Sequence, residues 1–290
     1  MVDLAKGDKM NIIKIGAAAL NQIPLDWKGN QSRIEDVITK AYNENVAILL
    51  LPELCISGYG CEDAFFSHDV QLKSKEVLNN IIDFIDQLDF FGKIVVSVGL
   101  PYFINGAIYN VSALIDKAGI IGYIPKQNLA NDGVHYEGRW FKAWEADNKQ
   151  LVGSDKIPFG DFLINFNGVK IGYEICQDAW VSNRPGINHA KHGVDIILNP
   201  SASHFAFGKH ALREQFIKEG SRSFKCAYVY ANLLGNEAGS SIFEGDTFIA
   251  VGNNIVASGE RLSFQDSILT TAVIDIDELK TLQGMDGSFH

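Results

Sequence analysis

The residue that most strongly indicates catalysis is a cysteine at the end of a predicted strand. Residues 169–175 alternate apolar and other side chains, which predicts a strand, and Cys176 follows directly. Turn-forming residues, 182–186 (SNRPG), come soon after it. Catalytic residues of α/β proteins are often presented in such loops, and a thiolate is a strong nucleophile. Cys176 is therefore a candidate nucleophile, with a buried, inert thiol as the alternative.

Two charged residues follow strands in a similar way. Glu53 comes after the apolar run 46–51 and a proline, and Lys126 comes after Pro125. Apolar surroundings raise the pKa of a carboxyl group, which suits a general base. Because strand ends can meet at one edge of a sheet, we predict that Glu53, Lys126 and Cys176 converge as base, cation and nucleophile. The alternatives are a solvated loop glutamate and a surface lysine.

The elements needed to position these residues can be read along the chain. A capping box at 32–35 begins a first helix, and further helices are expected at 78–88 and 210–225. The order begins βαβαβ, continues through hairpins and returns to βαβ, which predicts an α/β fold of mixed sheets with helices outside. The predicted strands are 12–20, 46–51, 94–99, 108–115, 120–124, 162–166, 169–175, 194–198, 227–232, 247–251 and 255–258.

The sequence shows neither an internal repeat nor a linker, so we expect one domain over residues 1–290. Its core should run from about residue 11 to residue 277, with a polar tail after Asp277 that leaves the core.

Composition disfavours several classes of function. The chain has 290 residues and a net charge of −10, without a Lys/Arg cluster, which argues against nucleic acid or an anionic membrane as partner. No apolar run approaches the ~20 residues of a membrane span. The 4 cysteines lack zinc-type spacing, and no apolar signal segment is evident. We therefore expect free thiols, no metal site and a cytoplasmic location.

The motifs around these three residues resemble those of the nitrilase (carbon–nitrogen hydrolase) superfamily. Residues 51–53 (LPE) with 57–59 (SGY) resemble its glutamate motif, and 172–178 (GYEICQD) its cysteine motif. Lys126, with Glu137 and Arg139 behind it, resembles its lysine motif. The resemblance covers essentially the whole chain and implies a four-layer α-β-β-α sandwich.

Within the superfamily, the sequence is most similar to the glutaminase domains of glutamine-dependent NAD synthetases. The matching stretches are 58–63 (GYGCED), 131–137 (NDGVHYE), 176–180 (CQDAW) and 199–205 (NPSASHF). This resemblance implies hydrolysis of L-glutamine to supply ammonia for NAD synthesis, and a homo-oligomer. It also implies a C-terminal synthetase domain, which this chain lacks and to which ATP and Mg²⁺ would be confined. No cofactor is expected in the present domain.

The resemblance also implies roles for individual residues. Cys176 would attack the glutamine amide to form a thioester, and Glu53 would move the protons. Lys126 and the backbone N–H of Gln177 would support the oxyanion. Gln177 stands where these synthetases usually carry glutamate, so the role of its side chain is open. Glu137 would orient Lys126, or it forms a structural salt bridge with Arg139.

The amino-acid end of glutamine requires partners of both charges. Lys209 would pair with the α-carboxylate, Asp132 would face the α-ammonium, and Ser203 would lie beside them. The alternative for Lys209 is an exposed side chain before the helix 210–225.

Other functions are consistent with parts of the sequence. The chain could be a stand-alone amidase or nitrilase for another small amide, or an inactive regulatory module with this fold. A Cys-His protease would need a histidine such as His204 or His135 beside Cys176. His189 and His192 are expected at the surface of a short helix, and a zinc site there would lack further ligands.

Overall fold

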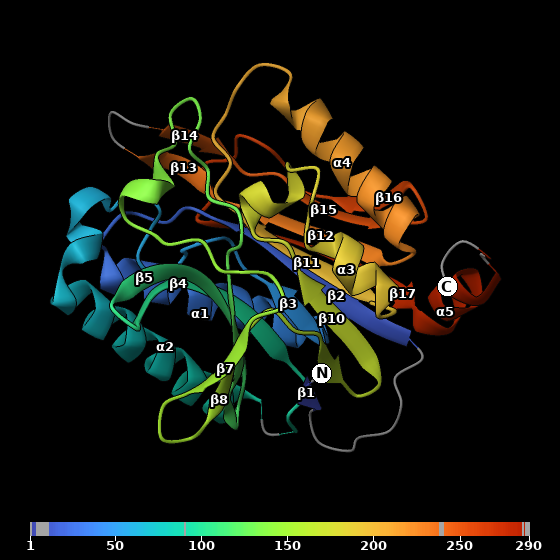
Figure 1. Cartoon of the computed structure of the whole chain (residues 1–290), viewed down its shortest axis with the longest axis horizontal. Helices are drawn as coiled ribbons and strands as arrows, with labels where there is room; N and C mark the ends of the chain where they lie inside the picture. The colour runs from blue at the N-terminus through green and yellow to red at the C-terminus, as the bar shows by residue number, and fades with distance from the viewer. Residues whose placement is uncertain (1, 4–11, 90, 238–240, 286, 288–290) are drawn as a thin grey trace.

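The computed structural model describes residues 2–3, 12–89, 91–237, 241–285 and 287. Two sheets pack face to face, and helices cover both outer sides (Figure 1). This arrangement is the four-layer α-β-β-α sandwich that the sequence predicts. Within the described ranges, no helix has both the length and the hydropathy to cross a membrane.

The first sheet is the larger. Its outer face is covered by α1 (Trp27–Asn43) and α2 (His68–Leu88), whose apolar side chains form one cluster with those of the strands. In spatial order its strands are β17 (Ser267–Asp275), β2 (Ile12–Leu20), β3 (Ile48–Leu50), β4 (Val95–Ile104), β5 (Ala107–Asp116), β6 (Gly119–Pro125), β8 (Ile157–Gly160) and β7 (Lys149–Val152).

The second sheet is covered by α3 (Gly186–Lys191) and α4 (Lys209–Phe224). Ile217 and Phe224 of α4 belong to one apolar cluster with Tyr228. In spatial order its strands are β1 (Val2–Asp3), β9 (Ile164–Phe166), β10 (Val169–Tyr173), β11 (Ile196–Ser201), β12 (Ala227–Asn232), β15 (Thr247–Val251) and β16 (Asn254–Ser258). A separate ribbon pairs β13 (Leu234–Glu237) with β14 (Ser241–Glu244).

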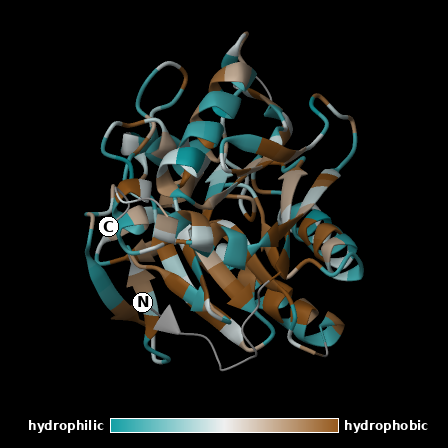
Figure 2. Ribbon diagram, turned by 90° about the vertical axis from the view of Figure 1, so that its right-hand side faces the viewer, coloured by the Kyte–Doolittle hydropathy of each residue, from teal (hydrophilic) through white to brown (hydrophobic). Residues whose placement is uncertain are grey.

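The main core lies between the two sheets. Ile15, Ile48 and Leu114 of the first sheet share one buried cluster with Ile171 and Val229 of the second. The interior strands are mostly brown in Figure 2, whereas the helices carry hydrophilic colour as well. Strands buried on both faces require continuous apolar runs, which is why these strands could be found in the sequence.

Several boundaries differ from those predicted, among them the start of α2 at His68 and the end of β4 at Ile104, and two further differences have a clear physical reason. The capping box at 32–35 is wrong, because α1 begins at Trp27, where Asp26 accepts a hydrogen bond from the Gly29 N–H at 3.1 Å. The polar tail expected after Asp277 is also wrong: α5 (Ile276–Met285) buries Leu279 against the core.

The topology brings the critical strand ends to one edge. β3 is parallel to β4, and β6 runs in the same direction because it is two antiparallel pairings away from β4. In the facing sheet, β10 and β11 are parallel. The loops that leave β3, β6, β10 and β11 carry Glu53, Lys126, Cys176 and Ala202.

A buried arginine fixes the loop after β11. Arg213 of α4 is fully buried and donates to Glu244 and, at 2.7 Å, to Asp246. The same guanidinium donates to the carbonyls of Ser203 and His204 at 3.0 and 2.9 Å. One cation therefore joins α4, the ribbon strand β14 and the loop that borders the site.

We predict that Arg213→Met lowers the free energy of unfolding by about 3–5 kcal/mol, because it removes the cation that pairs buried carboxylates. Urea denaturation measures the change. The matched control is Arg222→Met on the same helix, whose exposed pair with Glu219 should contribute little to stability. Equal losses for the two variants would contradict this account of the loop.

Candidate active site

Glu53 and Lys126 form a buried ion pair. The Lys126 Nζ lies 2.6 Å from Glu53 Oε1, and both side chains are fully buried. The solvated glutamate and the surface lysine considered above are therefore both excluded. The strand ends bring these two residues together as expected, and their chemical roles remain predictions.

A second carboxylate contacts the same lysine. Glu137, in the short η2 helix (Glu137–Arg139), accepts from Lys126 Nζ at 2.8 Å. Arg139 pairs instead with Asp63 at 2.6 Å, so the alternative salt bridge between Glu137 and Arg139 is wrong. Tyr59 donates to Glu137 at 2.7 Å, and the Ala130 N–H donates to it at 3.1 Å.

The electrostatics follow from this arrangement. Burial opposes the charge of Lys126, but Glu137 and Glu53 hold its pKa above the usual range. Burial raises the pKa of Glu53, and the positive charge of Lys126 acts in the opposite direction. One cation thus serves two carboxylates, and the remaining negative charge is stabilised by N–H and O–H donors.

Asn110 was not identified from the sequence. It lies in β5, where its side-chain amide donates to Glu53 Oε1 at 2.6 Å. Its backbone carbonyl accepts from the Lys126 N–H at 2.9 Å, so one residue positions both members of the pair. A polar side chain inside the apolar run 108–115 was the available signal.

Cys176 begins the short η3 helix (Cys176–Ala179) just after β10. Its φ of +46° is unusual for a residue with a side chain and marks a constrained turn. Burial, together with the nearby Glu53 carboxylate, raises the pKa of the thiol to about 12. The resting residue is therefore a thiol, which requires a base before it can attack.

Backbone contacts connect Cys176 with Glu53. The Ala202 N–H, in the loop after β11, donates to Glu53 Oε2 at 2.8 Å. The same N–H acts on the Cys176 thiol, where it opposes the rise in pKa that burial causes. Glu53 and Cys176 therefore border a common point on the loop that Arg213 secures.

Asp178 links the turn of the cysteine to the loop of the lysine. Its carboxylate accepts from the N–H groups of Asn128 at 2.7 Å and Gln127 at 3.2 Å. The other oxygen accepts from the Ile175 N–H at 2.9 Å. The sequence showed Asp178 only as part of the motif, whereas the structure gives it a positioning role.

Gln177 occupies the first turn of η3 and is half-buried. N–H groups in the first turn of a helix have no acceptor within the helix. This location is compatible with the oxyanion role assigned to the Gln177 N–H, which stays a prediction.

The three residues expected to hold the amino-acid end lie in different environments. Lys209, at the start of α4, places its Nζ 5.7 Å from the centre of the Trp180 ring. Burial lowers the pKa of Lys209, while the nearby Cys176 acts in the opposite direction. Ser203 is buried, and its hydroxyl accepts from Arg213 at 3.2 Å. Asp132 is exposed.

The histidines do not form a protease-like pair with the thiol in the contacts described. His204 contacts His135 at 2.8 Å and Lys209 at 3.2 Å, while Glu53 faces Lys126 rather than solvent. The surface prediction for His189 is wrong: it is buried against Gly172, where a side chain would collide with its ring. Among the described residues, no group of three or more His, Cys, Asp or Glu is placed to hold a metal.

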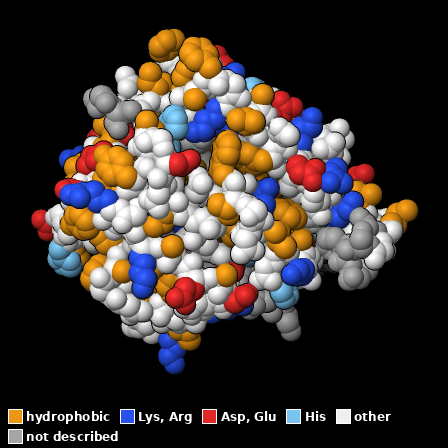
Figure 3. All heavy atoms as spheres, turned by 45° about the horizontal axis from the view of Figure 1, so that its top comes forward, with side chains coloured by type: hydrophobic (Ala, Val, Ile, Leu, Met, Phe, Trp, Pro, Cys, Tyr) orange, Lys and Arg blue, Asp and Glu red, His pale blue; other side chains and the backbone are white. Residues whose placement is uncertain are grey.

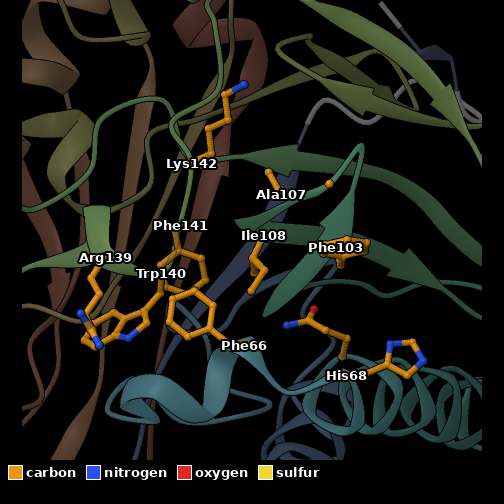
Figure 4. A pocket seen from close by; sticks show the side chains of 11 residues that line it. Phe66, His68, Phe103, Ala107, Ile108, Arg139, Trp140, Phe141 and Lys142 are labelled. Carbon is orange, nitrogen blue, oxygen red and sulfur yellow. The ribbon is translucent and has the colours of Figure 1, made fainter.

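A separate cavity of about 410 Å³ is lined in part by residues 139–142, which follow Glu137 along the chain. Its walls are largely apolar, with Phe66, Phe103 and Trp140 around it (Figure 4). Glu53, Lys126 and Cys176, the predicted triad, do not line this cavity. Its lining therefore does not provide the groups that amide hydrolysis requires. On the face shown in Figure 3, acidic, basic and hydrophobic groups are interspersed, without one large basic patch.

The chain is similar in sequence to glutamine-dependent NAD(+) synthetases. The chain is 30% identical to the glutamine-dependent NAD(+) synthetase of Oryza sativa subsp. indica, over 97% of this chain and 39% of that protein. It is 31% identical to the corresponding protein of Saccharomyces cerevisiae, over 93% of this chain and 39% of that protein. The chain therefore spans about two fifths of the length of these relatives.

Solved structures agree with the fold. The glutamine-dependent NAD(+) synthetase of Cytophaga hutchinsonii aligns with a TM-score of 0.83 and 44% identity, over 91% of this chain and 43% of that one. An amidase from Nesterenkonia sp. aligns with a TM-score of 0.74 at 17% identity, over 92% of each chain, and shares the fold. The family model for carbon-nitrogen hydrolases matches residues 14–281. With that match over most of its length, the chain belongs to the carbon-nitrogen hydrolase family.

Proposed function

We propose that this chain hydrolyses the side-chain amide of L-glutamine through a thioester on Cys176. The ammonia would serve the ATP-dependent synthesis of NAD from nicotinic acid adenine dinucleotide. The observation that carries the proposal is the buried Glu53–Lys126–Glu137 network beside a cysteine in a constrained turn. The substrate is inferred from the names of the relatives, and the type of reaction is inferred from the buried network.

In the first half of the reaction, Glu53 takes the thiol proton as the Cys176 sulfur bonds to the amide carbon. Lys126 and the Gln177 N–H stabilise the negative charge that develops on the amide oxygen. Glu53 then gives the proton to the amide nitrogen, the C–N bond breaks, and ammonia leaves. The γ-glutamyl group remains as a thioester.

In the second half, water attacks the thioester carbon while Glu53 accepts its proton. The C–S bond breaks, glutamate forms, and Glu53 returns the proton to sulfur. The same carboxylate therefore acts alternately as base and acid. Fixed contacts from Asn110 and the Ala202 N–H keep its oxygens in place during both halves.

The setting of this reaction follows from the relatives. We propose that the partner is an NAD synthetase domain, that ATP and Mg²⁺ act there, and that this domain needs no cofactor of its own. A homo-oligomer in the cytoplasm is the corresponding expectation for the assembly and its location.

We predict that Cys176→Ala abolishes ammonia release from glutamine and that Cys176→Ser is nearly as inactive, because a carboxylate is a weak base for a hydroxyl. A glutamine-like diazoketone should label Cys176, as identified by peptide mass spectrometry. Cys55, Cys61 and Cys226, which are also buried free thiols, are internal controls. Labelling of one of these in place of Cys176 would overturn the assignment.

The protonation state of the thiol gives a second prediction. Because burial raises the pKa of Cys176 to about 12, the ultraviolet thiolate absorbance of wild type minus Cys176→Ala should stay flat at neutral pH. It should rise only as the solution approaches that alkaline value. A thiolate step near neutral pH would show that the cysteine is ionised before substrate binds.

Lys209→Ala should raise the KM for glutamine by roughly 30-fold, the equivalent of about 2 kcal/mol for a partly buried charge pair. Steady-state kinetics measures the change, and Lys218→Ala, on the exposed side of the same helix, is the control. A KM within about twofold of wild type would place the α-carboxylate elsewhere. Equal turnover of a simple aliphatic amide would indicate a general amidase instead.

A further inference from the structure

A chain of polar contacts connects the buried triad with Lys209. Tyr59 lies 2.7 Å from Glu137 Oε1 and 3.0 Å from His135 Nδ1. His135 Nε2 lies 2.8 Å from His204 Nδ1, which is also 3.2 Å from the Lys209 Nζ. The chain runs from the network around Lys126 to the residue proposed to hold the substrate carboxylate.

Counting protons from the buried end gives the chain one direction. The Glu137 carboxylate accepts from Lys126 Nζ and from the Ala130 N–H, and the single hydroxyl proton of Tyr59 is likewise directed to it. The Tyr59 oxygen must then accept from His135, which places a proton on His135 Nδ1. If Tyr59 donated to His135 instead, two oxygens would face each other at 2.7 Å without a proton between them.

The remaining protons follow from the neutrality of His135. Burial lowers the pKa of His135 to about 4, so the ring carries one proton at neutral pH. That proton is on Nδ1, and Nε2 must accept from His204 Nδ1–H. The Lys209 ammonium at 3.2 Å then faces an N–H group that cannot accept from it.

We propose that Tyr59 and His135 are positioning residues that prevent His204 Nδ1 from accepting a hydrogen bond from the Lys209 ammonium. That ammonium is thereby left available for the substrate carboxylate. The identity of this carboxylate as that of glutamine rests on the proposed function, whereas the direction of the chain does not. Asp132, the exposed acid whose charge acts on Lys209, stands farther from it than an ion pair would.

The reverse direction would have the opposite consequence. With His204 Nδ1 unprotonated, its single lone pair would be shared by the donors Lys209 Nζ and His135 Nε2–H. A substrate carboxylate would then have to displace the hydrogen bond between Lys209 and His204. Holding the chain in the first direction therefore favours ligands that bring a negative charge to Lys209. Removal of the Tyr59 hydroxyl should release the chain into the reverse direction.

Nitrogen NMR of the histidine-labelled protein tests the direction without any ligand. In wild type, His135 and His204 should each carry the proton on Nδ1, with signals assigned through His135→Gln and His204→Gln. In Tyr59→Phe, both protons should move to Nε2. Tyr42→Phe, which alters a tyrosine of α1 packed against the core, should leave both rings unchanged. Protonation at Nε2 in wild type, or unchanged rings in Tyr59→Phe, would overturn the proposal.

Calorimetry in the Cys176→Ala background tests the consequence for binding. The variant that retains Tyr59 should bind glutamine more tightly than its α-carboxamide analogue. Tyr59→Phe should reduce this ratio of affinities about fivefold, as expected for one hydrogen bond. An unchanged preference would contradict the link to Lys209. If neither compound binds, the assignment of glutamine fails, and the NMR result alone decides the direction of the chain.

Discussion

The positive charge of Lys126, held in the interior between two carboxylates, is the interaction on which the site depends. Glu53 and Glu137 are both buried, so each depends on the lysine for a countercharge. Breaking such a buried arrangement typically costs about 3–5 kcal/mol, because an unpaired charge is left behind. In the proposed reaction the same charge stabilises the amide oxygen as it becomes negative, which would join the stability of the site to its chemistry.

Each surrounding element can be understood as a support for this charge. β3 and β6 end at the same edge of one sheet and position Glu53 and Lys126, while β10 of the facing sheet positions Cys176. Asp178 connects the lysine loop with the cysteine turn, and Arg213 secures the loop whose Ala202 N–H donates to Glu53. The sandwich therefore positions the triad from both of its inner layers.

Glu53, Lys126 and Cys176 could be found in the sequence because each follows a predicted strand, recognised from an apolar run or, before Cys176, from alternating residues. The contacts that position them could not, since these contacts join distant segments: Glu53 and Ala202 are 149 residues apart. Asn110 looked like one polar residue inside a strand. The start of α1 was missed because the Asp26 cap was less conspicuous than a later Ser-Arg-Ile-Glu pattern. Local patterns identify elements, whereas tertiary packing decides their partners.

The account rests on Glu53 acting as the base for Cys176, and rapid-quench mass spectrometry of the covalent glutamyl intermediate tests this claim most directly. In Glu53→Gln, which keeps the size and polarity of the side chain but cannot take a proton, the thioester should form at least about 10²-fold more slowly than in wild type. Formation of the intermediate on Cys176 at the wild-type rate would show that another group removes the thiol proton, and would contradict the mechanism.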